Sequence, residues 1–258
     1  MLEYLFSQLR ERPHLFLDKM ASLLEQRFAV AVSPSTISRM LTENGWSKKV
    51  IRQVSTRRDA DLRDFYLYNL SQFRSYHLVY VDESGCDKRA GRRRTGWSPR
   101  GVTPVQISEF QRGQRYHILP AYAQDGVVLS RIYQGSTDAA VFEDFIEQLL
   151  HHCGRWPAAK SVLIMDNASF HHSQKISQMC REAGVKLLYL PPYSPDLNPI
   201  EEFFSELKGF IKRSWELYVD SHGRNFQRFL QWCVDIVGAR EQSAVGHFQH
   251  AGLAIDQM

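Results

Sequence analysis

The amino-acid sequence predicts an α/β protein: a mixed β-sheet, with three antiparallel strands followed by two parallel ones, flanked by helices and preceded by a small all-helical region. From residue 77 onward, apolar runs and amphipathic stretches follow the order βββαβαβα, which is typical of a mixed sheet covered by helices. Residues 1–76 show only helical periodicity. The 258 residues, 43% of them hydrophobic, suffice for one ordinary domain and a smaller one.

The N-terminal region is predicted to hold two helices joined by a short turn. Apolar residues recur at helical spacing between positions 15 and 28. A second helix should begin at Ser33, a good N-cap followed by proline, and end near Gly45, with Ile37 on its inward side. The residues expected to point outward are Ser35, Thr36, Ser38 and Arg39. This pattern is typical of a helix-turn-helix, although a plain helical hairpin fits these residues equally well.

A charged stretch over residues 48–63 separates this region from the sheet. A domain boundary is therefore expected between residues 50 and 75. The predicted division is a helix-turn-helix region (1–60), a linker or helix (61–76), the sheet domain (77–213) and a C-terminal helical extension (214–258).

Each element of the sheet domain is predicted from its hydrophobic pattern. Short apolar runs bounded by turn residues predict strands, and amphipathic stretches predict helices. The predicted strands are 77–83, 103–110, 116–123, 127–133, 161–166 and 185–190. The predicted helices are 138–152, about ten residues from Ser173, 200–213 after a proline-rich turn, and one around 226–237. Three of the first four strands should form an antiparallel meander.

The charge distribution favours a polyanionic partner. Residues 1–76 hold 12 lysines and arginines against 8 acidic residues, whereas residues 141–258 hold 11 against 14. So modest an excess also occurs in proteins that bind no nucleic acid. No apolar run approaches the ~20 residues that a membrane span needs, so no membrane partner is expected. The four cysteines are widely spaced without a C-x-x-C pair, which indicates neither a zinc site nor a disulfide framework.

Three acidic residues lie where an element leaves the predicted core. Asp82 and Asp166 each end an apolar strand, and Glu201 opens the helix after the proline-rich turn. Carboxylates that converge at strand ends suit Mg²⁺ or Mn²⁺, and three of them can hold two ions that clamp the attacking and leaving oxygens of a phosphodiester. The alternative is that the aspartates only form turns and the glutamate only complements the helix dipole.

The residues around these acids form three blocks. They read V-D-E-S at Asp82, M-D-N-A-S-F-H at Asp166 and L-P-P-Y-S-P-D-L-N-P-I-E ending at Glu201, with 34 residues between the last two acids. A basic block, R-R-R-T-G-W-S-P-R-G, ends at Gly101. Over residues 77–213 these blocks and their spacing closely resemble the Asp-Asp-Glu branch of the Tc/mariner superfamily of DDE transposases.

The resemblance implies an RNase H-like fold in which Asp82, Asp166 and Glu201 hold two Mg²⁺ or Mn²⁺ ions. Glu201 is preferred to the glutamate after it because the family places its acid directly after Pro-Ile. Two further residues of the second block, Asn167 and His171, would orient a phosphate or a water. Structural hydrogen bonding in their loop is an equal alternative for both.

The expected partner is double-stranded DNA, both transposon ends and target, bound by a homodimer. The basic residues expected to contact it, besides those of the recognition helix, are Lys48, Lys49, Lys88, Arg89, Arg92, Arg93, Arg94 and Arg100. The basic residues that follow the first acid could instead belong to a solvated hairpin. Trp97, which lies among them, is expected to anchor in the core rather than to stack on a base.

The function expected from the resemblance is cleavage at transposon ends and joining of the freed 3′-OH to target DNA. Two alternatives stay open: a catalytically silent, transposon-derived DNA-binding protein, and a metal nuclease without strand transfer. The region before the sheet has room for one helix-turn-helix where family members usually have two, so a shortened N-terminus is expected. The protein should act in the nucleus of a eukaryotic host, which we prefer, or in a bacterial cytoplasm.

Overall fold

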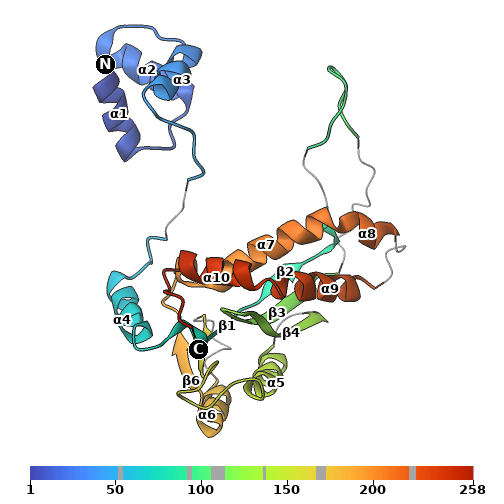
Figure 1. Cartoon of the computed structure of the whole chain (residues 1–258). Helices are drawn as coiled ribbons and strands as arrows, with labels where there is room; N and C mark the ends of the chain where they lie inside the picture. Colours follow the sequence, from blue (N-terminus) through green and yellow to red (C-terminus); the bar gives the residue numbers. More distant parts are fainter. Residues whose placement is uncertain are drawn as a thin grey trace. The chain divides into compact units, whose positions relative to one another are not determined.

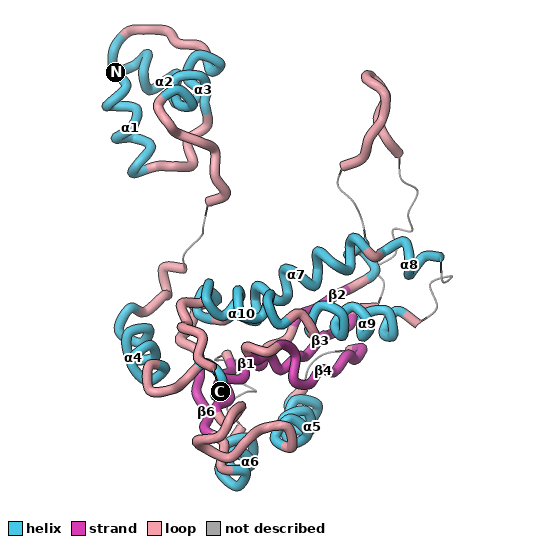
Figure 2. Tube along the Cα trace, viewed as in Figure 1, coloured by secondary structure: helices cyan, strands magenta, loops and turns pink. Residues whose placement is uncertain are grey.

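The computed structural model describes residues 1–51, 55–91, 95–105, 114–135, 138–166, 173–220 and 225–257. The chain divides into two units, Met1–Thr56 and Arg57–Met258 (Figure 1). All regular structure described in the smaller unit is helical, and the larger unit holds the sheet (Figure 2). Within the described ranges, no helix has both the length and the apolar character that a membrane crossing requires.

The smaller unit consists of α1 (Leu2–Glu11), α2 (Leu17–Phe28) and α3 (Pro34–Glu43). The periodicity predicted α2 and α3, whereas α1 is an additional helix. Ser33 caps α3 as expected, because its Oγ accepts a hydrogen bond from the backbone N–H of Thr36 at 3.2 Å. The buried core consists of Leu5, Leu9, Met20, Leu24 and Ile37. The prediction of a small all-helical region is confirmed.

The larger unit is built on a six-stranded mixed sheet within the described residues. Its strands are β1 (Leu78–Val81), β2 (Ser84–Cys86), β3 (Tyr116–Ala123), β4 (Gly126–Gln134), β5 (Val162–Met165) and β6 (Lys186–Tyr189). Strands β1, β2 and β4 all pair antiparallel with β3, and β5 pairs in parallel with both β1 and β6. The predicted combination of antiparallel and parallel strands is confirmed. Because β1 and β5 are parallel neighbours, their carboxyl ends lie at the same edge of the sheet.

Helices cover both faces of this sheet. They are α4 (Ala60–Leu70), α5 (Ala139–Leu150), α6 (Gln174–Ala183), α7 (Pro199–Arg213), α8 (Trp215–Asp220), α9 (Phe226–Gly238) and α10 (Glu241–His250). Figure 1 shows α7, α9 and α10 on one face and α5 and α6 on the other. Side chains alternate along each strand, so Tyr80 and Tyr122 belong to the core beneath α7, and Val79 and Leu119 to the core beneath α5.

One predicted strand is not found in its described part. Residues 103–105 have no regular structure, and residues 106–110 lie outside the described residues. The additional antiparallel pairing with β3 comes instead from β2, which follows β1 after a break at Asp82 and Glu83. A strand of three residues is too short to produce a clear hydrophobic pattern. The break places the first predicted metal ligand between two strands.

Candidate active site

The sheet brings the first two acids side by side. Asp82 directly follows Val81, and Asp166 directly follows Met165. Val81 and Met165 are register partners in the parallel pair β1–β5. Both aspartates are partly buried. Glu201 lies in the first turn of α7 and is exposed. The strand ends and the start of α7 therefore carry the three predicted acids.

Two neutral donors hold the carboxylate of Asp82. Its Oδ1 accepts a hydrogen bond from the backbone N–H of Glu83 at 2.7 Å. Its Oδ2 accepts one from the side-chain amide of Asn198 at 3.0 Å. The same Asn198 caps α7, because its Oδ1 accepts the backbone N–H of Ile200 at 3.3 Å. One side chain therefore fixes both the start of α7 and the orientation of Asp82.

The charges of Asp166 and Glu201 act on the carboxylate of Asp82. Burial raises the pKa of Asp82 to about 7, assisted by the negative charges of Asp166 and Glu201 and opposed by the hydrogen bond from Glu83. Burial and the like charges of the neighbouring acids both favour the protonated form of Asp82. The edge of the sheet thus gathers acidic side chains whose charges act on Asp82.

The structure distinguishes Glu201 from its neighbour Glu202. The carboxylate of Glu202 lies 2.9 Å from Nδ1 of His250 on α10. Glu201, unlike Glu202, contributes to the raised pKa of Asp82. The two side chains therefore have different neighbours: Glu202 pairs with His250, whereas the charge of Glu201 acts on Asp82.

The acids do not form a closed metal site in this conformation. Among the described residues, no group of three or more histidine, cysteine, aspartate or glutamate side chains is close enough together to hold a metal ion. The two supporting residues named from the sequence, Asn167 and His171, lie outside the described part of the chain. The structure therefore brings the three acids to one edge without joining them around one point.

The smaller unit exposes most of the predicted DNA-binding side chains. On α3, Ser35, Ser38 and Arg39 are exposed. Thr36 is only partly exposed, because its hydroxyl lies 2.9 Å from Oγ of Ser33 and belongs to the helix cap. After the helix, Lys48 and Lys49 are exposed as well. Of the four residues of α3 that were predicted to face a DNA groove, Thr36 is thus the one whose side chain contacts its own helix cap.

In the larger unit, the predicted basic residues differ in their surroundings. Lys88 and Arg89 are exposed in a short 3₁₀ turn, where Nε of Arg89 donates to Asp87 at 2.8 Å. Arg100 is exposed without regular structure, and the predicted residues Arg92, Arg93 and Arg94 lie outside the described part.

The expectation that Trp97 anchors in the core is wrong. Its relative exposure is 102%, so the side chain buries no surface against the described residues. Val105, in the same described segment, is 86% exposed. The aromatic character of a tryptophan favours burial on average, but Trp97 lies in a segment without regular structure and does not pack against the described residues.

Sequence reasoning missed Asn198 as a residue of the site. The Asn-Pro pair before the helix was a usable signal for an N-cap. Its second contact, to Asp82 at a separation of 116 residues, depends on how α7 lies against the sheet. No local pattern could reveal that contact.

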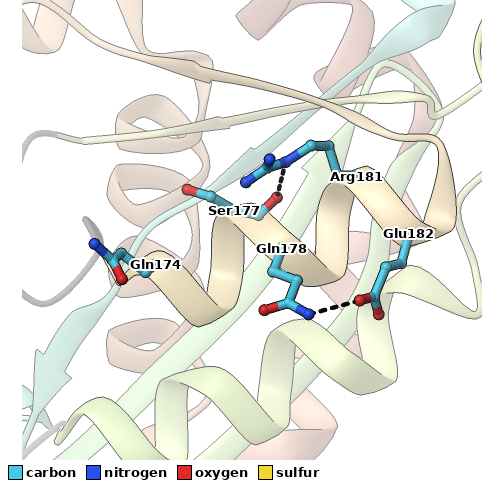
Figure 3. Close-up of a pocket in the computed structure, with 5 residues that line it drawn as sticks. All are labelled: Gln174, Ser177, Gln178, Arg181 and Glu182. Carbon is cyan, nitrogen blue, oxygen red and sulfur yellow. Dashed lines mark hydrogen bonds between the residues drawn. The ribbon is translucent and has the colours of Figure 1, made fainter.

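A shallow hollow of about 680 Å³ lies elsewhere, along the surface of α6 (Figure 3). It is lined by Gln174, Ser177, Gln178, Arg181 and Glu182. Two of these side chains bond within the helix: Gln178 donates to Glu182 at 2.8 Å, and Nε of Arg181 donates to the carbonyl of Ser177 at 3.4 Å. The hollow gathers no set of catalytic groups, so the strand-end acids are the better candidate.

Two protein families match this chain. Residues 77–218 match the DDE superfamily endonucleases, and residues 17–64 match the winged helix-turn-helix family. The first match includes all three acids.

Curated relatives resemble only part of the chain. It is 37% identical over 79 residues to the transposase of transposable element Tcb1 of Caenorhabditis briggsae, covering 30% of this chain and 29% of that protein. It is 33% identical over 76 residues to the Tcb2 transposase of the same organism, covering 29% of this chain and 28% of that protein. The matched part thus spans less than a third of either relative.

Solved structures share the fold across both units. A Mos1 transposase paired-end complex with the left transposon end superposes with a TM-score of 0.63 at 18% identity, covering 97% of this chain and 79% of that chain. A mariner Mos1 paired-end complex with Mg gives a TM-score of 0.62 at 19% identity, covering 97% and 78%. At such low identity, the likeness concerns the fold alone.

Proposed function

Because this chain belongs to the DDE endonuclease superfamily, we propose that it is a transposase that cleaves phosphodiester bonds in DNA and joins the freed 3′-OH to a target strand. The observation that carries the proposal is the placement of Asp82 and Asp166 directly after register partners of the parallel strands β1 and β5, with Glu201 in the first turn of α7, where its charge contributes to the raised pKa of Asp82. Carboxylate oxygens gathered at one edge of a sheet are suitable ligands for divalent ions such as Mg²⁺ and Mn²⁺.

The proposed cofactor is a pair of Mg²⁺ or Mn²⁺ ions held by Asp82, Asp166 and Glu201. The donor set fits hard cations, because it consists of carboxylate oxygens. Similar solved structures are described as Mos1 paired-end complexes with Mn and with Mg, which supports these two metals. When bound, the ions would lower the pKa of an attacking water and stabilise the departing 3′-oxygen. The hydrogen bonds from the backbone N–H of Glu83 and the side-chain amide of Asn198 would hold the Asp82 carboxylate in a fixed orientation.

The proposed partner is double-stranded DNA. The exposed Ser35, Ser38 and Arg39 would enter a groove from α3, and Lys48 and Lys49 would neutralise phosphates. Support comes from the winged helix-turn-helix match and from a similar structure that is described as a complex with a transposon end. We further propose that the protein acts as a homodimer, in the nucleus if its host is eukaryotic.

The test compares cleavage of a labelled DNA duplex by the wild type, Asp166→Asn and Glu201→Gln with Mg²⁺ or Mn²⁺. Both variants should lose cleavage and keep DNA affinity, because each removes a ligand charge and leaves the basic surface unchanged. Glu202→Gln is the matched control, since Glu202 pairs with His250, and it should still cleave. Undiminished cleavage by the variants, or by the wild type in EDTA, would disprove the metal-dependent mechanism.

The same reactions separate the finer alternatives. A supercoiled target plasmid reports whether the cleaved end is joined to it. Cleavage without joined product would reduce the function to that of a metal nuclease. DNA binding without any cleavage would identify a catalytically silent DNA-binding protein.

A further inference from the structure

We propose that Arg58 and Arg63 are positioning residues that hold the loop before α7 in place through Asp196. This inference rests on the function proposed above, because the loop leads to the residues of the candidate active site. Neither arginine would touch DNA or a reacting atom.

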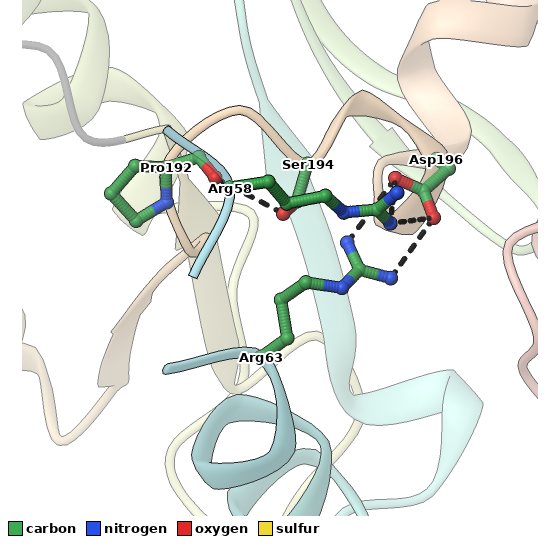
Figure 4. A network of polar contacts seen from close by, with 5 residues as sticks. All are labelled: Arg58, Arg63, Pro192, Ser194 and Asp196. Carbon is green, nitrogen blue, oxygen red and sulfur yellow. Dashed lines mark hydrogen bonds and ion pairs between the residues drawn. The ribbon is translucent and has the colours of Figure 1, made fainter. Parts of the chain in front are cut away.

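The three side chains form a compact ionic cluster (Figure 4). Arg63 binds Asp196 with two parallel contacts, Nη1 to Oδ1 at 3.2 Å and Nη2 to Oδ2 at 3.0 Å. Nη2 of Arg58 bridges the same two oxygens at 2.8 and 2.7 Å. The side chains are only 20%, 16% and 28% exposed for Arg58, Arg63 and Asp196. Planar guanidinium groups that share a partly buried carboxylate impose a defined geometry, unlike an ordinary surface ion pair.

The local structure of α4 explains why two like charges meet. Asp59 caps this helix by accepting the backbone N–H of Leu62 at 3.0 Å. Arg58 therefore lies just before the cap and Arg63 at the fourth helical position, two places whose side chains lie next to each other at a helix start. Without an acid between them the guanidinium groups would repel. Although burial opposes it, the hydrogen bond from Arg63 and the charges of both arginines lower the pKa of Asp196.

From Asp196 the loop runs directly to the candidate site. Asp196 lies in the 3₁₀ turn Pro195–Leu197, and the backbone N–H of Asn198 donates to the carbonyl of Pro195 at 3.1 Å. Asn198 then binds Asp82, and its carbonyl accepts the backbone N–H of Glu201 at 3.2 Å. A displacement of the turn would therefore be transmitted to two of the three proposed metal ligands.

The loop also contains a backbone conformation that needs support. Tyr193 has φ of 55°, in the left-handed region that costs a non-glycine residue about 1 kcal/mol or more. Nη1 of Arg57 lies 3.4 Å from its hydroxyl, and Oγ of Ser194 donates to the carbonyl of Pro192 at 3.2 Å. Contacts from the first residues of the larger unit thus hold the loop at two points, at Tyr193 and at Asp196.

The competing role is contact with DNA phosphates. Lys48 and Lys49 are exposed and suited to that role, whereas the guanidinium groups of Arg58 and Arg63 are largely buried against Asp196. Using them for phosphate contacts would require breaking four hydrogen bonds to a carboxylate. The geometry therefore favours positioning over DNA contact.

The test uses the full chain with Arg63→Gln, Asp196→Asn and the double variant. Each should lower kcat for cleavage at saturating DNA about tenfold and weaken Mn²⁺ binding measured by EPR, with unchanged DNA affinity. The double variant should be no worse than Asp196→Asn alone, because both changes remove the same contact. Arg63→Lys should restore part of the rate, since it keeps the charge but loses the paired geometry.

The matched control is Arg74→Gln, which removes one guanidinium from an exposed ion pair with Asp256 and should change none of these quantities. Weaker DNA binding by Arg63→Gln, with a shallower salt dependence and normal kcat, would overturn the proposal in favour of DNA contact. Additive effects in the double variant, or no gain from Arg63→Lys over Arg63→Gln, would also overturn it.

A readout that needs no activity separates this inference from the proposed function. The side-chain amide NMR signals of Asn198 in metal-free protein should shift in Arg63→Gln and Asp196→Asn but not in Arg74→Gln. Unshifted signals would disprove the positioning role even if the wild type cleaves DNA. Shifted signals in a wild type that cleaves nothing would leave the positioning role standing and disprove the proposed reaction.

Discussion

The raised pKa of Asp82 predicts an unusual dependence of stability on pH. Its value rises from 3.8 to about 7 on folding, so between these two pH values the folded chain keeps a proton that the unfolded chain has lost. The free energy of unfolding of the metal-free protein should therefore fall as pH rises through this window, by at most about 1.4 kcal/mol per pH unit. With a shift of about three units, the whole loss has an upper limit of about 4 kcal/mol.

Asp82→Asn should remove this loss, because an amide does not ionise. The variant also places an amide against the donor amide of Asn198, which costs about 1–3 kcal/mol. That cost does not vary with pH, so it lowers the free energy of unfolding by the same amount at every pH and leaves its slope against pH unchanged. Burial lowers the pKa values of three histidines, the buried His77 and the partly buried His117 and His247, and these groups tilt the curve the opposite way below pH 6.5. The three histidines are present in both the wild type and Asp82→Asn, so their contribution cancels in the difference between the two free energies of unfolding.

The assay is denaturant unfolding of the wild type and Asp82→Asn in EDTA, at half-unit steps from pH 4.5 to 8.5. The difference between the two free energies of unfolding should change steadily up to about pH 7 and then level off. Asp61→Asn, which removes an exposed acid on α4, is the control and should follow the wild type. Parallel curves for the wild type and Asp82→Asn would refute the reasoning that burial and the neighbouring acids raise the pKa of Asp82.

Three further predictions concern other parts of the chain. Ile37→Ala should destabilise the smaller unit by about 2–5 kcal/mol, because Ile37 is fully buried in its core; amide hydrogen exchange should become faster in that unit and stay unchanged in the strands of the larger unit. Arg39→Ala should weaken binding to all DNA sequences and make the salt dependence shallower by about one unit, measured by fluorescence anisotropy; an unchanged slope would exclude a phosphate contact. Trp97→Ala should change the free energy of unfolding by less than about 0.5 kcal/mol, because Trp97 is fully exposed, and a loss of several kcal/mol would restore the core role.

The sequence by itself determined the features that depend on a few neighbouring residues. The caps at Ser33, Asp138 and Ser173 follow from side chains that bond their own backbone two or three positions on. Most strands and helices of the sheet domain follow from periodicity, although the three-residue strand β2 does not. The three acidic blocks with their spacing identified the superfamily, which the match over residues 77–218 confirms. These signals are local, so they are present in the sequence before the chain folds.

Only the tertiary structure decided which distant residues meet. Asn198 reaches Asp82 across 116 residues, and Asp196 reaches Arg58 across 138. The first contact depends on how α7 packs against the sheet, and the second on how the start of α4 lies against the loop before α7. No short window of sequence contains either arrangement. Burial was decided in the same way, since Trp97 is a large aromatic residue of the kind found in cores, yet it is fully exposed among the described residues. The hydrophobicity of a side chain indicates that burial is favourable, but only the neighbours in the folded structure determine whether the side chain is buried.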